Sequence, residues 1–88
     1  MEGVPQNLDS EAVEHAMRDM EGVSAIHDVH IWTLASGVVA LSAHVVLADM
    51  HGWMEVLPKM REMLNENYGI NHVTLQPETE QWLVKRGV

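Results

Sequence analysis

The chain has 88 residues, 13 acidic and 5 basic side chains and a net charge of -8, which predicts one small acidic domain. A chain of this length buries only about 60 to 65% of the surface of its unfolded form, so a dimer interface or a bound metal would help it to fold. The absence of cysteine excludes a disulfide and a thiolate metal site. The negative charge disfavours nucleic acid or an anionic membrane as the main partner.

Six histidines stand among these carboxylates, and together they form a pool of nitrogen and oxygen ligands suited to divalent metals such as zinc. An apolar fraction of 47% argues against disorder. No run reaches the roughly 18 to 20 apolar residues that span a bilayer, and the start MEGVP lacks the basic and apolar regions of a signal peptide. We therefore expect this stretch of chain to be soluble.

Three turn-forming residues predict an extended lead-in at residues 1–8: Gly3, Pro5 and Asn7. A helix follows, because apolar residues recur at helical spacing: Val13, Ala16, Met17 and Met20. Asp9 or Ser10 can cap its start, and Gly22 stands where a left-handed C-cap is expected.

Two antiparallel strands are predicted next, at 23–34 and 38–47, where β-branched and aromatic residues are frequent. Gly37 between them permits a tight hairpin turn. The core face comprises Val29 and Ile31 of the first strand and Val39, Leu41, Ala43, Val45 and Leu47 of the second. The opposite face is mixed, and we expect a partner subunit to cover part of it: His30, Trp32, Ser42, His44 and Val46.

A second helix follows the turn at 49–52, and Gly69 marks its end. Its apolar residues again hold helical spacing: Trp53, Leu57, Met60 and Leu64. Because proline fits only the first turn of a helix, Pro58 predicts a start no earlier than about Met54, or else a kink. A short third strand is predicted at 72–76, ended by Pro77 and Glu78, and 79–88 form a tail. The predicted order is α-β-β-α-β.

The register of the hairpin decides which side chains meet across it. A three-residue loop places Asp28 opposite His44, whereas a two-residue loop places His27 opposite His44. Either arrangement sets a carboxylate or an imidazole beside His44. The third strand adds His72 at its start and Glu78 just past its end, so these residues can meet the hairpin at one edge of the sheet.

The remaining histidines favour other interpretations. His15 lies off the apolar stripe of its helix and is expected in solvent, and His30 beside Trp32 fits an interface or core position better than a metal ligand. His51 fits a loop residue and an exposed ligand equally well. The chain has no glycine-rich phosphate loop, nucleophile elbow or catalytic constellation, so we expect no enzyme. A metal-dependent hydrolase with an open zinc position is the weakest hypothesis.

Three strings carry a resemblance to a known family: HDVHIWTL at 27–34, LSAHVVLAD at 41–49 and YGINHVTLQPE at 68–78. In this order, after the lead-in MEGVP, they resemble the cytosolic C-terminal domain of cation diffusion facilitator transporters, especially the bacterial branch that exports zinc, cobalt and cadmium. The resemblance covers residues 1 to about 80. It implies an α+β, ferredoxin-like (metallochaperone-like) domain of two layers, in which two helices cover one face of a three-stranded sheet.

The resemblance also implies metal ligands. The first histidine of the HDxH string and the histidine of the SAH string correspond to His27 and His44, and the acidic residue after TLQ corresponds to Glu78. Many relatives carry histidine where this chain has Asn71, and this chain offers His72 one residue later, on the opposite side of the strand. The predicted ligand set is therefore His27, His44, His51, His72 and Glu78, with Asp49, water or a site between subunits as alternatives for completing the shell.

The function that the resemblance implies is a divalent metal-binding regulatory domain, dimerising below a proton-coupled zinc, cobalt or cadmium efflux transporter. Residues 1–88 would be a single domain on the cytoplasmic side of the bacterial inner membrane, joined to a transmembrane part and without nucleic acid as a partner. The expected metal is zinc or another divalent cation such as cobalt, cadmium or nickel. The alternative is a stand-alone soluble metal-binding or metallochaperone module of the same fold.

Overall fold

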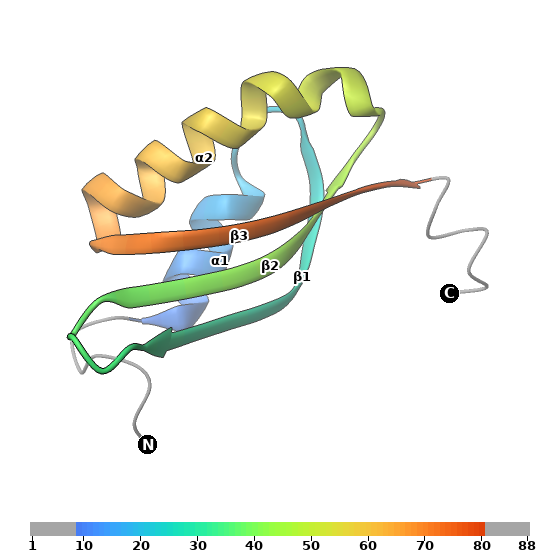
Figure 1. Cartoon of the computed structure of the whole chain (residues 1–88). Coiled ribbons are helices and arrows are strands. Elements are labelled where there is room, and N and C mark those ends of the chain that lie inside the picture. The colour runs from blue at the N-terminus through green and yellow to red at the C-terminus, as the bar shows by residue number, and fades with distance from the viewer. Residues whose placement is uncertain (1–8, 81–88) are drawn as a thin grey trace.

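Two helices and three strands make up the part of the chain that the computed structural model describes, residues 9–80 (Figure 1). In chain order they are α1 (Ser10–Arg18), β1 (Val23–Thr33), β2 (Val39–Leu47), a 3-10 turn η1 (Met50–Gly52), α2 (Trp53–Tyr68) and β3 (Ile70–Thr79). This confirms the predicted α-β-β-α-β order. The lead-in predicted at 1–8, and residues 81–88 of the predicted tail, lie outside the described residues.

Helix α1 begins where the sequence predicts but ends earlier. The Asp9 side chain caps it by accepting hydrogen bonds from the backbone N–H groups of Glu11 and Ala12, at 3.0 and 3.4 Å. The helix stops before it reaches Gly22, so the prediction that this glycine is its C-cap is wrong. Gly22 instead lies in the turn to β1 with a φ of 94°, and a Cβ atom there would come within 3.1 Å of Val56 Cγ2 in α2. Both the backbone conformation and the close approach of α2 favour glycine at this position.

The sheet has the order β1-β2-β3, and its central strand β2 is antiparallel to β1 and parallel to β3. Helix α2 makes the crossover that two adjacent parallel strands require (Figure 1). Both helices pack against the same face of the sheet, as predicted. The core between them consists mainly of Val13 and Met17 of α1, Val56, Met60 and Leu64 of α2, and Val39, Leu41, Ala43, Val45 and Leu47 of β2.

The opposite face of the sheet is not covered by α1 or α2, and we call it the helix-free face. Four rows of paired residues cross it from β1 through β2 to β3: Ala25, Val46 and Glu78; His27, His44 and Gln76; His30, Ser42 and Thr74; Trp32, Ala40 and His72. The expected cover of this face by a partner subunit stays a prediction. Four of the six histidines in the chain lie in these rows, so the fold gathers nitrogen ligands on one surface.

A bulge in β1 sets the register of the hairpin. The Leu34 N–H donates to the Val38 carbonyl at 2.8 Å, so the loop between them has three residues. Continued without interruption, this register would place Asp28 opposite His44. The register shifts between His27 and His30, so two residues of β1 stand opposite one residue of β2, and His27 pairs with His44 instead. The structure thus combines the longer predicted loop with the pairing expected from the shorter one.

Strand β3 is longer than predicted. It runs to Thr79 and includes Pro77 and Glu78, so the prediction that these two residues end the strand is wrong. Proline cannot donate to a sheet ladder, but β3 is an edge strand with a ladder on one side only, where proline is tolerated. Pro77 pairs with Val45, and Glu78 pairs with Val46 on the helix-free face. The extension therefore carries Glu78 into the sheet.

Helix α2 begins at Trp53, one residue before the predicted limit, and holds Pro58 in its interior. The missing N–H of Pro58 leaves the carbonyl group of Met54 without its helical donor. Met54 is 79% exposed, on the side of the helix where water is available to that carbonyl. Gly69 ends the helix with a φ of 68° and an N–H donated to Asn65, which confirms the predicted C-cap. Within residues 9–80, neither helix has the length and apolar character needed to cross a membrane.

Candidate metal centre

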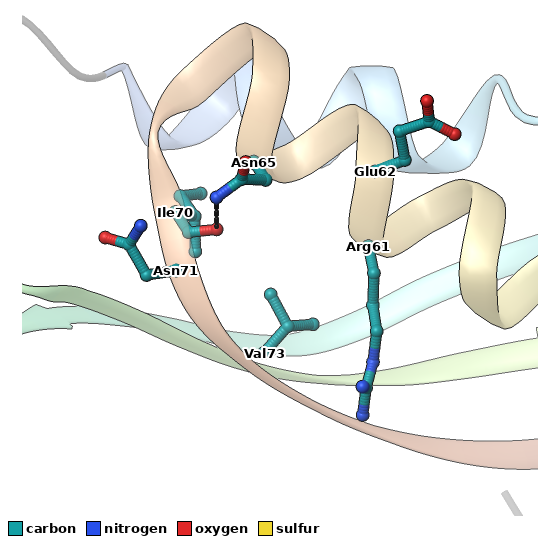
Figure 2. A pocket seen from close by; sticks show the side chains of 6 residues that line it. All are labelled: Arg61, Glu62, Asn65, Ile70, Asn71 and Val73. Atoms are coloured by element: carbon teal, nitrogen blue, oxygen red, sulfur yellow. Dashed lines mark hydrogen bonds between the residues drawn. The ribbon is translucent and has the colours of Figure 1, made fainter.

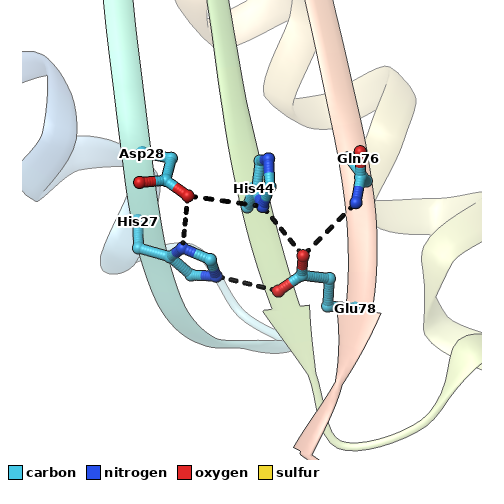
Figure 3. Close-up of polar contacts among 5 residues, drawn as sticks. All are labelled: His27, Asp28, His44, Gln76 and Glu78. Carbon is cyan, nitrogen blue, oxygen red and sulfur yellow. Dashed lines mark hydrogen bonds and ion pairs between the residues drawn. The ribbon is translucent and has the colours of Figure 1, made fainter. Parts of the chain in front are cut away.

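Three metal-ligating side chains converge at one end of the helix-free face, one from each strand (Figure 3). They are His27 of β1, His44 of β2 and Glu78 of β3. One ligand atom from each of them lies within 4.8 Å of the others. Among residues 9–80, this is the only group of three or more histidine and acidic side chains close enough together to hold a metal ion.

Strand pairing explains why these residues meet. The β1 bulge places His27 directly opposite His44, and their rings lie edge to face with centroids 4.8 Å apart and an interplanar angle of 64°. Gln76 pairs with His44 on the other side, so Glu78 stands one row further along the same face. From there its carboxylate reaches both imidazoles.

Glu78 is the buried acid of this cluster, with 3% of its surface exposed. Its Oε1 lies 2.8 Å from His27 Nε2, its Oε2 lies 2.8 Å from His44 Nδ1, and the Gln76 amide donates to Oε2 at 3.3 Å. Burial acts to raise the pKa of Glu78, but hydrogen bonding and charge interactions with His27 and then His44 outweigh it, so the pKa lies below its ordinary value. The side chain is therefore a carboxylate at neutral pH, the form that binds metal.

His44 presents a buried nitrogen to the same point. Its Nδ1 lies 2.8 Å from Glu78 Oε2 and 3.7 Å from Asp28 Oδ2, so carboxylate oxygens approach this nitrogen closely. A nitrogen this close to the Glu78 carboxylate is placed to share a cation with it.

The donor set of two imidazoles and one carboxylate fits zinc and similar divalent ions. Ligand atoms around a tetrahedral zinc lie about 3.3 Å apart, as follows from bond lengths of about 2.0 to 2.1 Å. The two contacts of Glu78 with the histidines, both 2.8 Å, are close to that spacing, and the longest separation of 4.8 Å has to shorten as an ion binds. Three protein ligands leave a fourth position for water or another donor.

Two of the predicted ligands lie outside this cluster. The His51 side chain is fully exposed in η1, where its Nδ1 lies 3.4 Å from Asp49 Oδ1. His72 is exposed on the helix-free face, where it pairs with Ala40 at the far end of the four rows. Gln76 follows His72 by four positions, which correspond to about 13 Å along a strand, too far for His72 to share an ion with His44.

Asp28 is the residue at this centre that the predicted ligand set lacks. Its Oδ2 lies 3.2 Å from His27 Nδ1 and 3.7 Å from His44 Nδ1, although its side chain is 61% exposed (Figure 3). The register argument considered this aspartate as a residue opposite His44 but gave it no place among the ligands. The bulge, which the sequence pattern does not reveal, brings its carboxylate beside both imidazoles.

The described residues also form hollows, including one away from the three candidate ligands and one beside them. One of about 270 Å³ lies between α2 and β3, and Arg61 extends from the helix toward the strand there (Figure 2). Its polar lining comprises one cationic side chain, the carboxylate of Glu62 and the amides of Asn65 and Asn71, and these do not form a cluster of metal ligands. A hollow of about 230 Å³ adjoins the metal ligands on the helix-free face and is lined by Asp28, His30, Ser42, Ala43, His44, Thr74 and Gln76. This second hollow leaves the candidate centre open to solvent.

The structure is a two-layer α+β domain that carries candidate histidine and carboxylate ligands on the open face of its sheet, a combination that fits a metal-binding domain. Residues 5–80 match the model of a family described as Cation efflux protein, cytoplasmic domain. Because the match covers most of the chain, the chain belongs to this family. The resemblance indicated by the three sequence strings is thereby confirmed.

Curated relatives agree with this assignment. The chain is 43% identical over 79 residues to the metal cation efflux system protein CzcD of Cupriavidus metallidurans, covering 89% of this chain and 25% of that protein. It is 43% identical over 82 residues to a cadmium, cobalt and zinc/H(+)-K(+) antiporter of Bacillus velezensis, covering 90% and 26%. It is 38% identical over 80 residues to metal tolerance protein 1 of Oryza sativa subsp. japonica, covering 91% and 19%. The chain thus spans about a fifth to a quarter of the length of these relatives.

Two solved structures have the same fold. The metal-bound C-terminal domain of the CzcD transporter from Cupriavidus metallidurans has a TM-score of 0.74 and 42% identity, covering 81% of this chain and 99% of that one. A structure of CzrB has a TM-score of 0.73 at 17% identity, covering 89% and 99%. The α+β fold predicted from the sequence is therefore confirmed.

Proposed function

We propose that this chain is the metal-binding regulatory domain of a cation efflux transporter, and that His27, His44 and Glu78 hold a divalent cation. The observation that carries the proposal is a carboxylate with only 3% of its residue surface exposed, placed between two histidines. A buried negative charge needs a compensating positive charge, which a divalent cation held by both histidines would supply. The similarity to a metal-bound domain of a CzcD transporter supports this assignment.

Zinc is the proposed ion, with cobalt, cadmium and nickel as other divalent ions that imidazole and carboxylate donors accept. The names of the relatives support this choice, since one is an antiporter of cadmium, cobalt and zinc. A bound ion would link all three strands through one ligand from each, so it would stabilise the folded domain. We assign the ion a regulatory role and propose no catalytic one.

We propose that the domain acts as a homodimer. Its small size and its mixed helix-free face, on which Trp32 is 39% exposed, support association with a second copy. Metal binding to both subunits of such a dimer would draw the subunits together, because it relieves the repulsion between two chains of charge -8. By linkage, any condition that favours the compact dimer would tighten metal binding.

Because the chain spans only 19 to 26% of the length of the curated relatives, we propose that residues 1–88 are the C-terminal cytoplasmic domain of a longer transporter. The ion pathway and its coupling to protons would then lie in a membrane-embedded part of the same protein. The domain would sense the ion on the cytoplasmic side of the bacterial inner membrane.

Calorimetric titration with zinc tests the ligand assignment on wild type and on His27→Ala, His44→Ala and Glu78→Gln. We expect each substitution to remove most of the zinc binding, because each deletes one of three ligands that converge on a single ion. Light scattering on the same samples reports whether the oligomer persists.

His15→Ala is the matched control, since this exposed histidine lies in α1, which packs against the face of the sheet opposite to the centre. His51→Ala and His72→Ala are expected to bind zinc as wild type does. Undiminished binding by His27→Ala, His44→Ala and Glu78→Gln would refute the proposed centre. Loss of binding in His51→Ala or His72→Ala alone would move the site to the corresponding residue.

A further inference from the structure

His27 lies between two carboxylates that contact opposite nitrogens of its ring (Figure 3). Nδ1 is 3.2 Å from Asp28 Oδ2, and Nε2 is 2.8 Å from Glu78 Oε1. A neutral imidazole has one N–H group and one nitrogen with a free lone pair, and only the latter can bind a metal. In the proposed centre Glu78 binds the same ion, so the nitrogen on its side, Nε2, is the one placed to be the ligand atom, and the proton would then be on Nδ1, where Asp28 can accept it.

We propose that Asp28 is the positioning residue of this metal centre. Its carboxylate accepts the hydrogen bond from His27 Nδ1–H, and this contact selects Nε2 as the metal ligand and fixes the orientation of the ring. Carboxylates that contact the second nitrogen of a metal-bound histidine do this in many metal sites, and their loss typically weakens metal affinity about 10- to 100-fold. The inference rests on the proposed function, because it presumes that His27 binds an ion.

The backbone of Asp28 contributes independently of its carboxylate. Asp28 has a φ of 56°, and among residues 9–80 it is the only residue other than glycine in this left-handed region. Aspartate and asparagine are among the few side chains that tolerate this conformation. The bulge there lets Asp28 and Val29 stand opposite the single residue Ala43. Without the bulge the pairing would slip by one residue and turn His27 toward the helices, away from the centre.

An exposed aspartate in a bulge can also serve the backbone alone, or bind the ion directly. Its side chain is 61% exposed, and its Oδ2 lies 3.7 Å from His44 Nδ1, which points toward the candidate centre. Direct binding is disfavoured because Asp28 and Glu78 approach His27 at different nitrogens, so one ion bound at Nε2 does not lie between them. The experiment separates all three roles.

The test compares zinc affinity in wild type, Asp28→Asn and Asp28→Gly by competition with a chromogenic chelator. Asparagine keeps the left-handed backbone and an oxygen acceptor without the charge, and glycine keeps the backbone without any side chain. We expect about 10- to 100-fold weaker binding for Asp28→Gly and a smaller loss for Asp28→Asn. Asp19→Asn, which removes an exposed carboxylate at the end of α1, is the charge-matched control and should bind within about twofold of wild type.

Nitrogen-15 NMR of the zinc-loaded protein supplies the readout that a purely structural role would not change. In wild type we expect His27 to carry its proton on Nδ1 and the metal on Nε2, and in Asp28→Gly we expect this preference to weaken. Thermal unfolding of the metal-free variants shows that the fold is retained. Absorption of the cobalt-loaded proteins reports the coordination number, which should be the same in wild type and Asp28→Asn.

Three outcomes would overturn the inference: equal affinity in wild type and Asp28→Gly, metal bound to His27 through Nδ1, or a lower coordination number in Asp28→Asn, which would make Asp28 a ligand. Failure of the proposed function gives a different result. In that case wild type itself takes up no zinc, and both proposals fall together. Zinc uptake by wild type with unchanged affinity in the Asp28 variants removes the positioning role alone.

Discussion

Glu78 shows how a single residue links the stability of the sheet to its chemistry. Residue burial would favour the neutral acid, yet the two histidines hold the pKa of Glu78 below its ordinary value. Such a carboxylate contributes stability that is fully present above the pKa of the unfolded chain, about 4.3, and is lost as the pH falls through the lower pKa of the folded state. The metal-free domain should therefore become less stable in acid partly through this one group.

Comparison of metal-free wild type with Glu78→Gln measures this contribution. We expect the difference in free energy of unfolding, wild type minus variant, to decrease as the pH is lowered from about 5 to about 3. In this range the side chain at position 78 takes up a proton on unfolding in wild type but not in the variant. Urea unfolding followed by circular dichroism gives the difference at each pH. Glu66→Gln, on the exposed side of α2, shows what the loss of a carboxylate at the surface does. A difference that grows in acid would mean that burial dominates and the pKa is raised.

At the scale of elements, the bulge in β1 depends on the left-handed backbone at Asp28, where φ is 56°. Alanine is strained in this region and glycine is not, whereas glycine loses more entropy on folding. We expect metal-free Asp28→Ala to be less stable than Asp28→Gly by about 1 kcal/mol, measured by urea unfolding. The same pair at Asp19, which has a right-handed backbone with a φ of -77°, should show the reverse order. An alanine variant as stable as the glycine variant at 28 would show that the bulge needs no left-handed residue.

Local patterns predict those elements whose causes are local. The alternation of apolar residues identifies the core face of β2, and Gly69 ends α2 in the conformation that glycine favours. The strand through Pro77 is not predictable in this way, since proline breaks a central strand and is tolerated at an edge. Only the order of the strands, with β3 outermost, decides between the two.

For the candidate site, the sequence likewise predicts what depends on local pattern and misses what depends on strand pairing. The hairpin left two registers open, which placed either Asp28 or His27 beside His44, and only the family resemblance implied that His27 and His44 are ligands together. The exact pairing depends on a bulge of one residue, and no periodic pattern encodes a single φ angle. The burial of Glu78 depends on the extension of β3, so the sequence placed this residue beyond the strand that holds it. His72 was included in the predicted ligand set although a separation of four residues, about 13 Å along a strand, lies between it and the row of His44.

At the scale of the whole molecule, charge is distributed unevenly between the two layers. The described lysine and arginine residues all lie on helices: Arg18, Lys59 and Arg61. The helix-free face therefore carries Asp28 and Glu78 without a basic side chain among residues 9–80. Two copies of a chain of charge -8 repel each other, and carboxylates that approach within the Debye length of about 8 Å at 0.15 M salt contribute to this repulsion.

This distribution predicts a dimer whose shape responds to metal. We expect small-angle X-ray scattering to show a smaller radius of gyration as zinc fills the sites, because each ion adds two positive charges beside the carboxylates of Asp28 and Glu78. The decrease should be larger in 0.05 M than in 0.5 M sodium chloride, since salt already screens the repulsion in the second case. His44→Ala, which lacks a ligand, should keep the size of the metal-free dimer at every zinc concentration. A zinc titration that fills the sites of wild type without compaction would leave the centre intact and refute the electrostatic mechanism proposed for it.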